Sequence, residues 1–156
     1  MNLFEEKAYQ PGKFFIELRR KNGELVKKVS LNTIVNAGKA ALASRINGNG
    51  GEAAFTYLAV GTNSTAVSGS DTALGAETVG SGLSRAAATA SCVTTSVTND
   101  TARLSYTFTV SGSVAITELG VFNNSSGGTM LCRTVFSALN VVSGDSLTIN
   151  YDVQAS

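Results

Sequence analysis

Residues 102–110, Ala-Arg-Leu-Ser-Tyr-Thr-Phe-Thr-Val, are the stretch that decides the fold. Apolar side chains occupy every second position from Ala102 to Val110, and polar side chains occupy the positions between them. Because successive side chains of a β-strand point to opposite faces of a sheet, this alternation predicts a strand with one buried face. Residues 147–153, Leu-Thr-Ile-Asn-Tyr-Asp-Val, repeat the pattern near the end of the chain.

Similar strand patterns occur on both sides of this stretch. Phe14, Ile16 and Leu18 recur with a period of two, and Asn22-Gly23 follows them. This dipeptide favours a type I′ hairpin turn, so a return strand is expected at residues 24–29. Further strands are predicted at residues 55–60, 92–98, 115–122 and 130–136. About seven or eight short strands separated by turn residues predict an all-β fold, mainly an antiparallel β-sandwich or a jelly-roll-like variant.

One short α-helix is predicted at residues 33–47, where small and apolar residues recur at helical spacing. Asn32 or Thr33 is expected to cap its start, and Gly48 is expected to end it. The expected buried face comprises Ile34, Gly38, Ala41, Leu42 and Ile46.

The chain of 156 residues is long enough for one domain with its own core. Residues 1–12 have no periodic pattern and contain the only proline, so we interpret them as an extended arm. Arm and hairpin together form an N-terminal unit at residues 1–30. The sandwich domain, with one helix near residues 33–47, is expected at residues 31–156.

Residues 61–90 are rich in Gly, Ser, Thr and Ala and are predicted to form a long loop. Leu74 and Leu83 are expected to fix this loop to the core. Long loops on a rigid scaffold are often binding elements. The loop also carries oxygen ligands of the kind that calcium uses, but the spacing of an EF-hand is absent, so no metal is predicted. These oxygen-bearing residues are Ser68, Ser70, Asp71, Thr72 and Glu77.

The composition argues against an enzyme. The chain has no histidine, which excludes Ser-His-Asp, Cys-His and histidine–metal sites. Cys92 and Cys132 are too far apart for a Cys-x-x-Cys zinc site, and both are expected to be buried thiols rather than a disulfide. Glu118 is expected to pair with an arginine or accept a backbone amide rather than act as a general base. No catalytic residue, cofactor or metal is predicted.

Charged residues make up only 15% of the chain, compared with roughly 25% in an ordinary soluble domain. Residues 1–50 hold nine Lys/Arg and four Asp/Glu, whereas residues 51–156 hold three and seven. This asymmetry could let subunits attract one another or dock on an acidic surface, or it could reflect a solvated hairpin.

The overall charge of +1 does not favour nucleic acid as a partner. No apolar run approaches the roughly 18–20 residues that span a bilayer, and no secretory signal is present, so no membrane partner is predicted.

Several segments resemble those of tailed-bacteriophage virion structural proteins. They appear in the expected order and cover most of residues 31–151. The resemblance implies a small β-rich subunit of a phage particle, of the kind found in capsid decoration or cement proteins and in related tail or fibre β-domains. It supplies no catalytic residues. The segments are Asn-Thr-Ile-Val-Asn-Ala-Gly-Lys at 32–39, Tyr-Leu-Ala-Val-Gly-Thr at 57–62, Asp-Thr-Ala-Leu-Gly-Ala-Glu at 71–77, Ile-Thr-Glu-Leu-Gly-Val-Phe at 116–122, Gly-Gly-Thr-Met-Leu-Cys-Arg-Thr-Val-Phe at 127–136 and Gly-Asp-Ser-Leu-Thr-Ile at 144–149.

The resemblance leads us to expect a decoration or cement protein that binds and stabilises the major capsid protein lattice. Such a protein would be a homo-oligomer, a trimer or a dimer, made in the cytoplasm of an infected bacterium and located in the virion. The alternative is a tail, baseplate or fibre component that attaches to the host, with residues 61–90 holding a glycan or receptor. The end of the chain at Ser156, without a long repetitive region, favours the first. The expected contact residues are Phe4, Tyr9, Phe14, Phe15, Asp71, Leu74 and Glu77.

Overall fold

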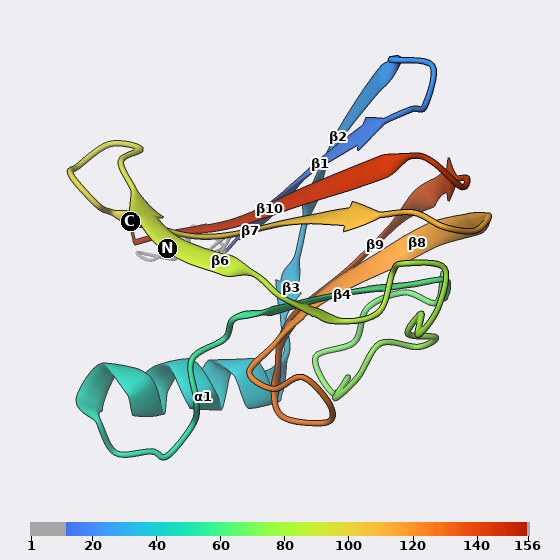
Figure 1. Cartoon of the computed structure of the whole chain (residues 1–156). Helices are drawn as coiled ribbons and strands as arrows, with labels where there is room; N and C mark the ends of the chain where they lie inside the picture. The colour runs from blue at the N-terminus through green and yellow to red at the C-terminus, as the bar shows by residue number, and fades with distance from the viewer. Residues whose placement is uncertain (1–11, 156) are drawn as a thin grey trace, which may run out of the picture.

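The computed structural model describes residues 12–155, which form two five-stranded antiparallel sheets and one helix (Figure 1). Sheet A has the strand order β2-β1-β10-β7-β6, and sheet B has the order β3-β9-β8-β4-β5. The predicted all-β sandwich with one short helix is therefore confirmed. The elements are β1 (Lys13–Arg19), β2 (Leu25–Leu31), β3 (Thr33–Ile34), α1 (Asn36–Asn47), β4 (Tyr57–Gly61), β5 (Ala86–Ala87), β6 (Thr89–Val93), β7 (Thr101–Thr109), β8 (Val114–Phe122), β9 (Met130–Val141) and β10 (Ser146–Gln154).

The chain passes from one sheet to the other along both sides of the sandwich. Only Asn32 separates β2, at the edge of sheet A, from β3, at the edge of sheet B (Figure 1). Only Ala88 separates β5 and β6, which form the two opposite edges. Each edge strand thus continues directly into an edge strand of the other sheet.

The alternation in the sequence places one face of each sheet-A strand in the core. Phe14 of β1 and Tyr151 of β10 are neighbours in register, both buried, with ring centroids 4.7 Å apart. Leu104 and Phe108 of β7 are buried on the same side of the sheet. The β1–β2 hairpin, at the start of the chain, is therefore an integral part of sheet A, because β1 pairs with β10 along its whole length.

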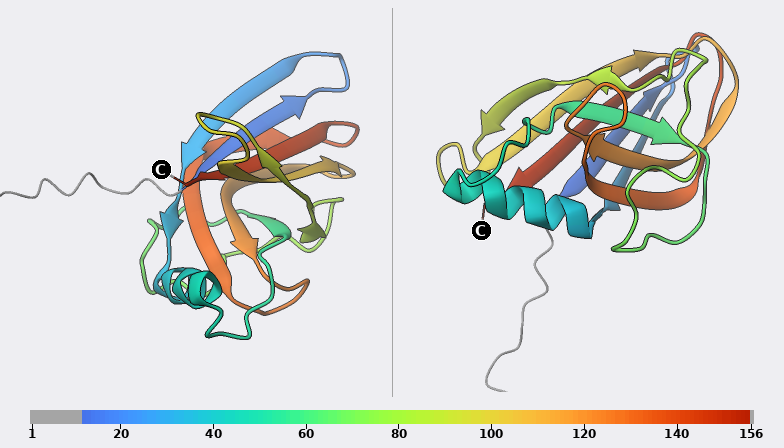
Figure 2. Two further views of the ribbon diagram at one scale, coloured as in Figure 1. Left: turned by 90° about the vertical axis from the view of Figure 1, so that its left-hand side faces the viewer. Right: turned by 90° about the horizontal axis from the view of Figure 1, so that it is seen from below.

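Helix α1 packs against β9 (Figure 2) and differs from the expected helix at its start. Its N-cap is Val35, which makes no side-chain capping bond. Asn32 and Thr33 cannot cap the helix because they lie where the chain crosses from β2 into β3. The predicted end is confirmed, since Gly48 adopts a left-handed conformation with φ 69°. Ile46, expected on the buried face, is 87% exposed.

The hairpin turn also differs from its prediction. A type I′ turn needs positive φ at both central residues, but only Gly23 has it, at 91°. The amide of Arg20 donates to the carbonyl of Glu24 at 2.8 Å, and that of Gly23 donates to the carbonyl of Arg20 at 2.9 Å. This is a three-residue loop with glycine in the left-handed position.

The strand predicted at residues 92–98 is shifted towards the N-terminus, since β6 ends at Val93. The Asp100 carboxylate accepts backbone N–H groups of Thr95, Ser96 and Val97 and folds this segment into a turn. Cys92 is exposed, so the expectation of a buried thiol was wrong there.

The other thiol, Cys132, is buried as expected, and neither cysteine is in a disulfide. Burial raises the pKa of the Cys132 thiol to about 12. The thiol therefore stays protonated at neutral pH.

A buried carboxylate fixes the hairpin to the turn between β9 and β10. Asp145 is 1% exposed and accepts hydrogen bonds from the Arg20 guanidinium at 3.0 Å, the Lys21 amide at 3.2 Å and the Val142 amide at 3.0 Å. Burial alone would raise the pKa of the Asp145 carboxyl, but these three donors outweigh burial and hold the pKa below its usual value.

Two adjacent residues, Phe14 and Phe15, test which face of β1 is buried. Phe14→Ala is expected to lower the free energy of unfolding by about 3–5 kcal/mol, because it leaves a cavity in the core. Phe15→Ala, on the opposite face of the same strand, is expected to cost no more than about 1 kcal/mol. Urea unfolding followed by circular dichroism measures both. Equal losses would contradict the register of β1.

The Asp145 carboxyl makes the free energy of unfolding depend on pH. A carboxyl whose pKa is lowered by folding stabilises the fold above its unfolded pKa of about 3.9, and this stabilisation is lost as pH falls through the folded value. Asp145→Asn is therefore expected to cost about 1–3 kcal/mol at pH 7, and its difference from the wild type is expected to shrink as the pH falls below the unfolded pKa of the carboxyl. Chemical unfolding at a series of pH values measures this convergence. A gap between the two proteins that stays constant from pH 7 to pH 2 would refute it.

Candidate functional site

A buried ion pair joins the centres of β8 and β9. The guanidinium Nε of Arg133 lies 2.7 Å from Oε2 of Glu118, and the two side chains are 3% and 0% exposed. Glu118 was expected to pair with an arginine or to accept backbone amides, and it does both.

The same carboxylate holds the first half of the long loop against sheet B. Glu118 accepts the backbone N–H groups of Asn63 at 3.2 Å, Gly75 at 3.0 Å and Ala76 at 2.7 Å. A side chain at Gly61 would overlap Glu118, so this close approach requires glycine. The loop is therefore held by hydrogen bonds to a buried charge.

Arg133 extends the network to the surface. Its guanidinium bonds to the Asp71 carboxylate at 2.9 Å, the Asn63 side-chain oxygen at 3.3 Å and the Thr65 carbonyl at 3.2 Å. The Ser68 amide, and then Arg133, hold the pKa of Asp71 below its usual value despite partial burial. The Asp71 carboxylate, considered above as a calcium ligand, is thus paired with an arginine. Residues 12–155 contain no group of three Asp, Glu, Cys or His side chains that could hold a metal ion.

A second anchor holds the far end of the loop. Arg85 makes two hydrogen bonds to the Glu77 carboxylate, at 2.8 and 2.6 Å, and lies over the Phe122 ring with its guanidinium carbon 3.6 Å from the centroid. It also donates to the carbonyls of Asn124 and Gly127 in the turn after β8. The loop and this turn therefore form one fixed end of the sandwich.

The residues expected to contact a partner are not gathered at one place. Phe4 and Tyr9 lie outside the described residues. Phe14 is completely buried, so its expected role as a contact is wrong, because it lies on the core face of β1. Phe15 points the other way and is partly exposed.

The three expected contacts in the loop hold the loop in place. Leu74 is 7% exposed and packs under the loop in a small cluster with Phe122. Asp71 and Glu77 are each engaged in an ion pair, with Arg133 and Arg85 respectively. These side chains fix the shape of the loop, and they leave little free polar surface for a ligand.

The outer face of sheet A is a broad surface that the sequence analysis did not identify. Cross-strand pairing places Val29 beside Phe15, and Phe15 beside Asn150, on this face. The apolar strip, defined as Phe15, Leu25, Val29 and Leu31, runs along its β2 edge, where the last three are 41%, 58% and 51% exposed. Small polar side chains follow on the two central strands: Ser146, Thr148 and Asn150 of β10, and Ser105, Thr107 and Thr109 of β7.

Charge on this face is only partly paired, because Lys13 and Arg19 of β1 are exposed on it and form no ion pair within residues 12–155. Arg103 makes two hydrogen bonds to Asp152, at 2.7 and 2.6 Å, and Lys27 lies 3.1 Å from Glu17. A face with small side chains, partly paired charges and an apolar margin is suited to bind another protein surface.

The sequence of β2 explains why the apolar strip was missed. The strand reads Leu-Val-Lys-Lys-Val-Ser-Leu, with apolar residues on both faces. Val26 faces inward while Leu25 and Val29 face outward, so a period-two pattern cannot assign the faces. Only the register with β1 identifies the exposed side.

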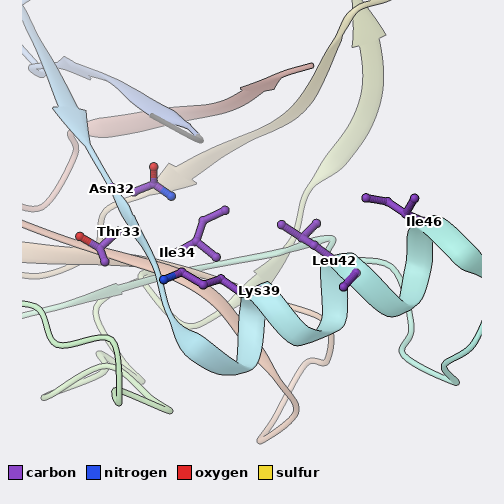
Figure 3. A pocket seen from close by; sticks show the side chains of 7 residues that line it. Asn32, Thr33, Ile34, Lys39, Leu42 and Ile46 are labelled. Carbon is purple, nitrogen blue, oxygen red and sulfur yellow. The ribbon is translucent and has the colours of Figure 1, made fainter. Parts of the chain in front are cut away.

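A groove lies between α1 and the crossing from β2 to β3. Its volume is about 620 Å³. Ile34, Leu42 and Ile46 project into the same space from the strand and the helix (Figure 3). The remaining lining residues are Asn32, Thr33, Lys39 and Ala43.

Comparison of the chain with protein-family models, with curated proteins and with solved structures finds no match. Within residues 12–155, no helix is long and apolar enough to cross a membrane.

The buried network can be tested by removing one of its charges. Arg133→Leu is expected to lower the free energy of unfolding by about 3–5 kcal/mol, because Glu118 is left buried without its partner. It is also expected to speed hydrogen exchange at the Gly75 and Ala76 amides. The control Arg103→Leu breaks the more exposed pair with Asp152 and is expected to cost about 1 kcal/mol or less. Similar losses for the two variants would show that Arg133 does not organise the loop.

Proposed function

We propose that this chain is a non-enzymatic structural protein of a bacteriophage particle, a decoration or cement subunit that binds the major capsid protein lattice and stabilises it. The observation that carries the binding role is the outer face of sheet A. It combines exposed apolar side chains, small polar side chains and two ion pairs on a five-stranded sheet.

The phage assignment rests on the segments that resemble virion proteins, and the fold gives these segments a common physical role. Glu118 belongs to one segment, Arg133 to a second and Asp71 to a third, and all three lie in one hydrogen-bonded network. The segments thus describe a single structural unit in which a long loop is fixed to sheet B. A unit of this kind favours the proposed capsid role, because a capsid subunit must keep its shape while it contacts its neighbours.

A rigid face also suits the energetics of a repeated lattice. Binding to a fixed surface avoids the entropy cost of ordering loops at the interface. When several subunits of one oligomer dock at neighbouring sites, weak contacts combine into high avidity. A trimer or dimer would therefore bind more tightly than its single contacts.

The second candidate is a tail, baseplate or fibre component that attaches to the host. The observation that favours this candidate lies at the end of the sandwich, where the long loop meets the turn after β8. Val79 projects there with 84% exposure, beside a small hollow lined in part by Ser84, Ser125 and Gly127. In this alternative the hollow would contact the receptor.

Substitution of the apolar strip separates the two candidates. Val29→Asp places a charge at the centre of the strip, where the side chain is 58% exposed, so the fold is expected to remain intact. We expect this variant to lose at least tenfold in binding to phage heads that lack the protein, measured by cosedimentation. Val97→Asp, in the turn after β6 with 68% exposure, is the matched control and is expected to bind like the wild type.

If Val29→Asp bound the heads as tightly as the wild type does, the outer face of sheet A would not be the binding surface. Heads without the protein are also expected to assemble but to release DNA at lower temperature or under milder osmotic shock. Heads as robust as the wild type, or a copy number of a few per particle with label at the tail, would favour the second candidate.

A further inference from the structure

The chain carries three Asn-Gly dipeptides, and the structure exposes all three. Asn22-Gly23 lies in the loop between β1 and β2, Asn47-Gly48 lies at the end of α1, and Asn49-Gly50 follows directly after it. In an Asn-Gly dipeptide the backbone nitrogen of the glycine can attack the asparagine side chain most easily. The reason is that glycine has no side chain to obstruct the approach and leaves the backbone free to turn.

This attack converts the side-chain amide into a carboxylate without a catalyst. The glycine nitrogen gives its proton to solvent and forms a bond to the side-chain carbonyl carbon of the asparagine. The bond from that carbon to the amide nitrogen breaks, and ammonia leaves behind a cyclic imide. Water then opens the ring at either carbonyl and yields aspartate or isoaspartate, so one water is consumed for each ammonia released. The reaction therefore needs a glycine N–H that is free and a backbone that can rotate.

The hairpin dipeptide does not meet these conditions. The Gly23 amide donates to the carbonyl of Arg20 at 2.9 Å, and the Asn22 side-chain oxygen accepts the amide of Glu24 at 3.0 Å. The loop is fixed further by the ion pair between Arg20 and the buried Asp145. Attack at Asn22 would first have to break the hydrogen bond of the attacking amide.

The dipeptide at the end of α1 is held in the same way. The Gly48 amide donates to the carbonyl of Ser44 and closes the last turn of the helix. The Asn47 side-chain oxygen accepts the amide of Asn49 at 2.9 Å. Asn47 is also the last residue of the helix, so its backbone is not free to rotate.

The third dipeptide differs from the other two. Within residues 12–155, the Gly50 amide donates to no protein acceptor, and the Asn49 side chain forms no hydrogen bond. The amide of Asn49 itself donates to the Ser44 carbonyl at 3.0 Å, which holds the chain on one side of the asparagine only. On the other side, neither helix nor strand constrains the backbone before β4 begins at Tyr57.

We propose that Asn49 is a site of spontaneous deamidation in the folded protein, whereas the fold protects Asn22 and Asn47. The observation that carries this inference is the free Gly50 amide, compared with the bonded amides of Gly23 and Gly48. The proposal does not depend on the capsid role.

The conversion alters the charge and the backbone beside α1. It lowers the formal net charge of the chain from +1 to zero, and proteins without net charge associate more readily. The new carboxylate lies just beyond the C-terminal end of α1, where the helix dipole disfavours negative charge. Isoaspartate also adds one carbon to the main chain at that point. The protein would thus change into a second form as it ages.

Peptide mapping of the full chain tests the site. The protein is kept in mildly alkaline buffer made with water that carries a heavy oxygen isotope, so each imide that opens is labelled, and digestion follows in ordinary water. We expect Asn49 to convert about fivefold faster than Asn22 or Asn47, or more, which is the factor that one hydrogen bond on the attacking amide implies. In urea, where all three amides are free, the difference is expected to disappear.

Two results would overturn the proposal. If Asn22 or Asn47 converted as fast as Asn49 in the folded protein, the hydrogen bonds of Gly23 and Gly48 would not protect them. If the same ranking persisted in urea, the neighbouring sequence would explain it, and the fold would have no part in it.

A matched pair of variants gives a second readout. The enzyme that methylates isoaspartate, supplied with a radiolabelled methyl donor, measures how much isoaspartate the aged protein contains. Asn49→Ser, at an exposed side chain without hydrogen bonds, is expected to lose most of this methylation, whereas Asn22→Ser is expected to keep it. Methylation that survives Asn49→Ser, or its absence from aged wild-type protein, would refute the assignment.

Discussion

The ion pair between Glu118 and Arg133 is the interaction on which the shape of this protein depends. It lies at the centre of sheet B, and both side chains are almost completely buried. Two opposite charges in such a place are stable only when their remaining hydrogen-bonding capacity is also used. Backbone amides of the long loop and the Asp71 carboxylate satisfy that requirement, so the loop is ordered by the need to complete a buried polar network. The loop is in this sense part of the core.

This arrangement gives a structural role to the segments on which the proposed phage assignment rests. The segments that carry it contain Glu118, Arg133, Asp71 and Gly61, which contact one another and leave little side-chain surface for a partner. These segments therefore form the structural scaffold of the protein. Exposed apolar side chains lie elsewhere, on the outer face of sheet A and in the groove beside α1.

The fold could be predicted from the sequence wherever one face of a strand is buried and the other is not. Residues 102–110 and 147–153 show this pattern and form β7 and β10 at the centre of sheet A. Prediction failed where a residue's role depends on a distant partner. Asp100 bends the chain after β6 through bonds to backbone amides, and the periodicity of the side chains does not reveal such bonds.

The candidate sites depend even more on long-range pairing. The position of Glu118 in a half-buried strand correctly indicated a structural pair, but nothing in the sequence identified Arg133 as its partner. The outer face became visible only through the register of β1 with β2, because β2 has apolar residues on both sides. For the same reason Phe14 was expected at a surface, although its neighbour Phe15 is the one that faces outward.

The two direct passages between the sheets, at Asn32 and Ala88, have a mechanical consequence. In a sandwich whose layers are joined only by long loops, the layers can slide or peel apart while each keeps its own hydrogen bonds. Here such a movement would have to tear β2 or β3, and β5 or β6, out of its sheet, since each passage is a single residue long. A pulling force applied to one layer is therefore carried to the other through the backbone itself, and the two layers should yield together in one abrupt event.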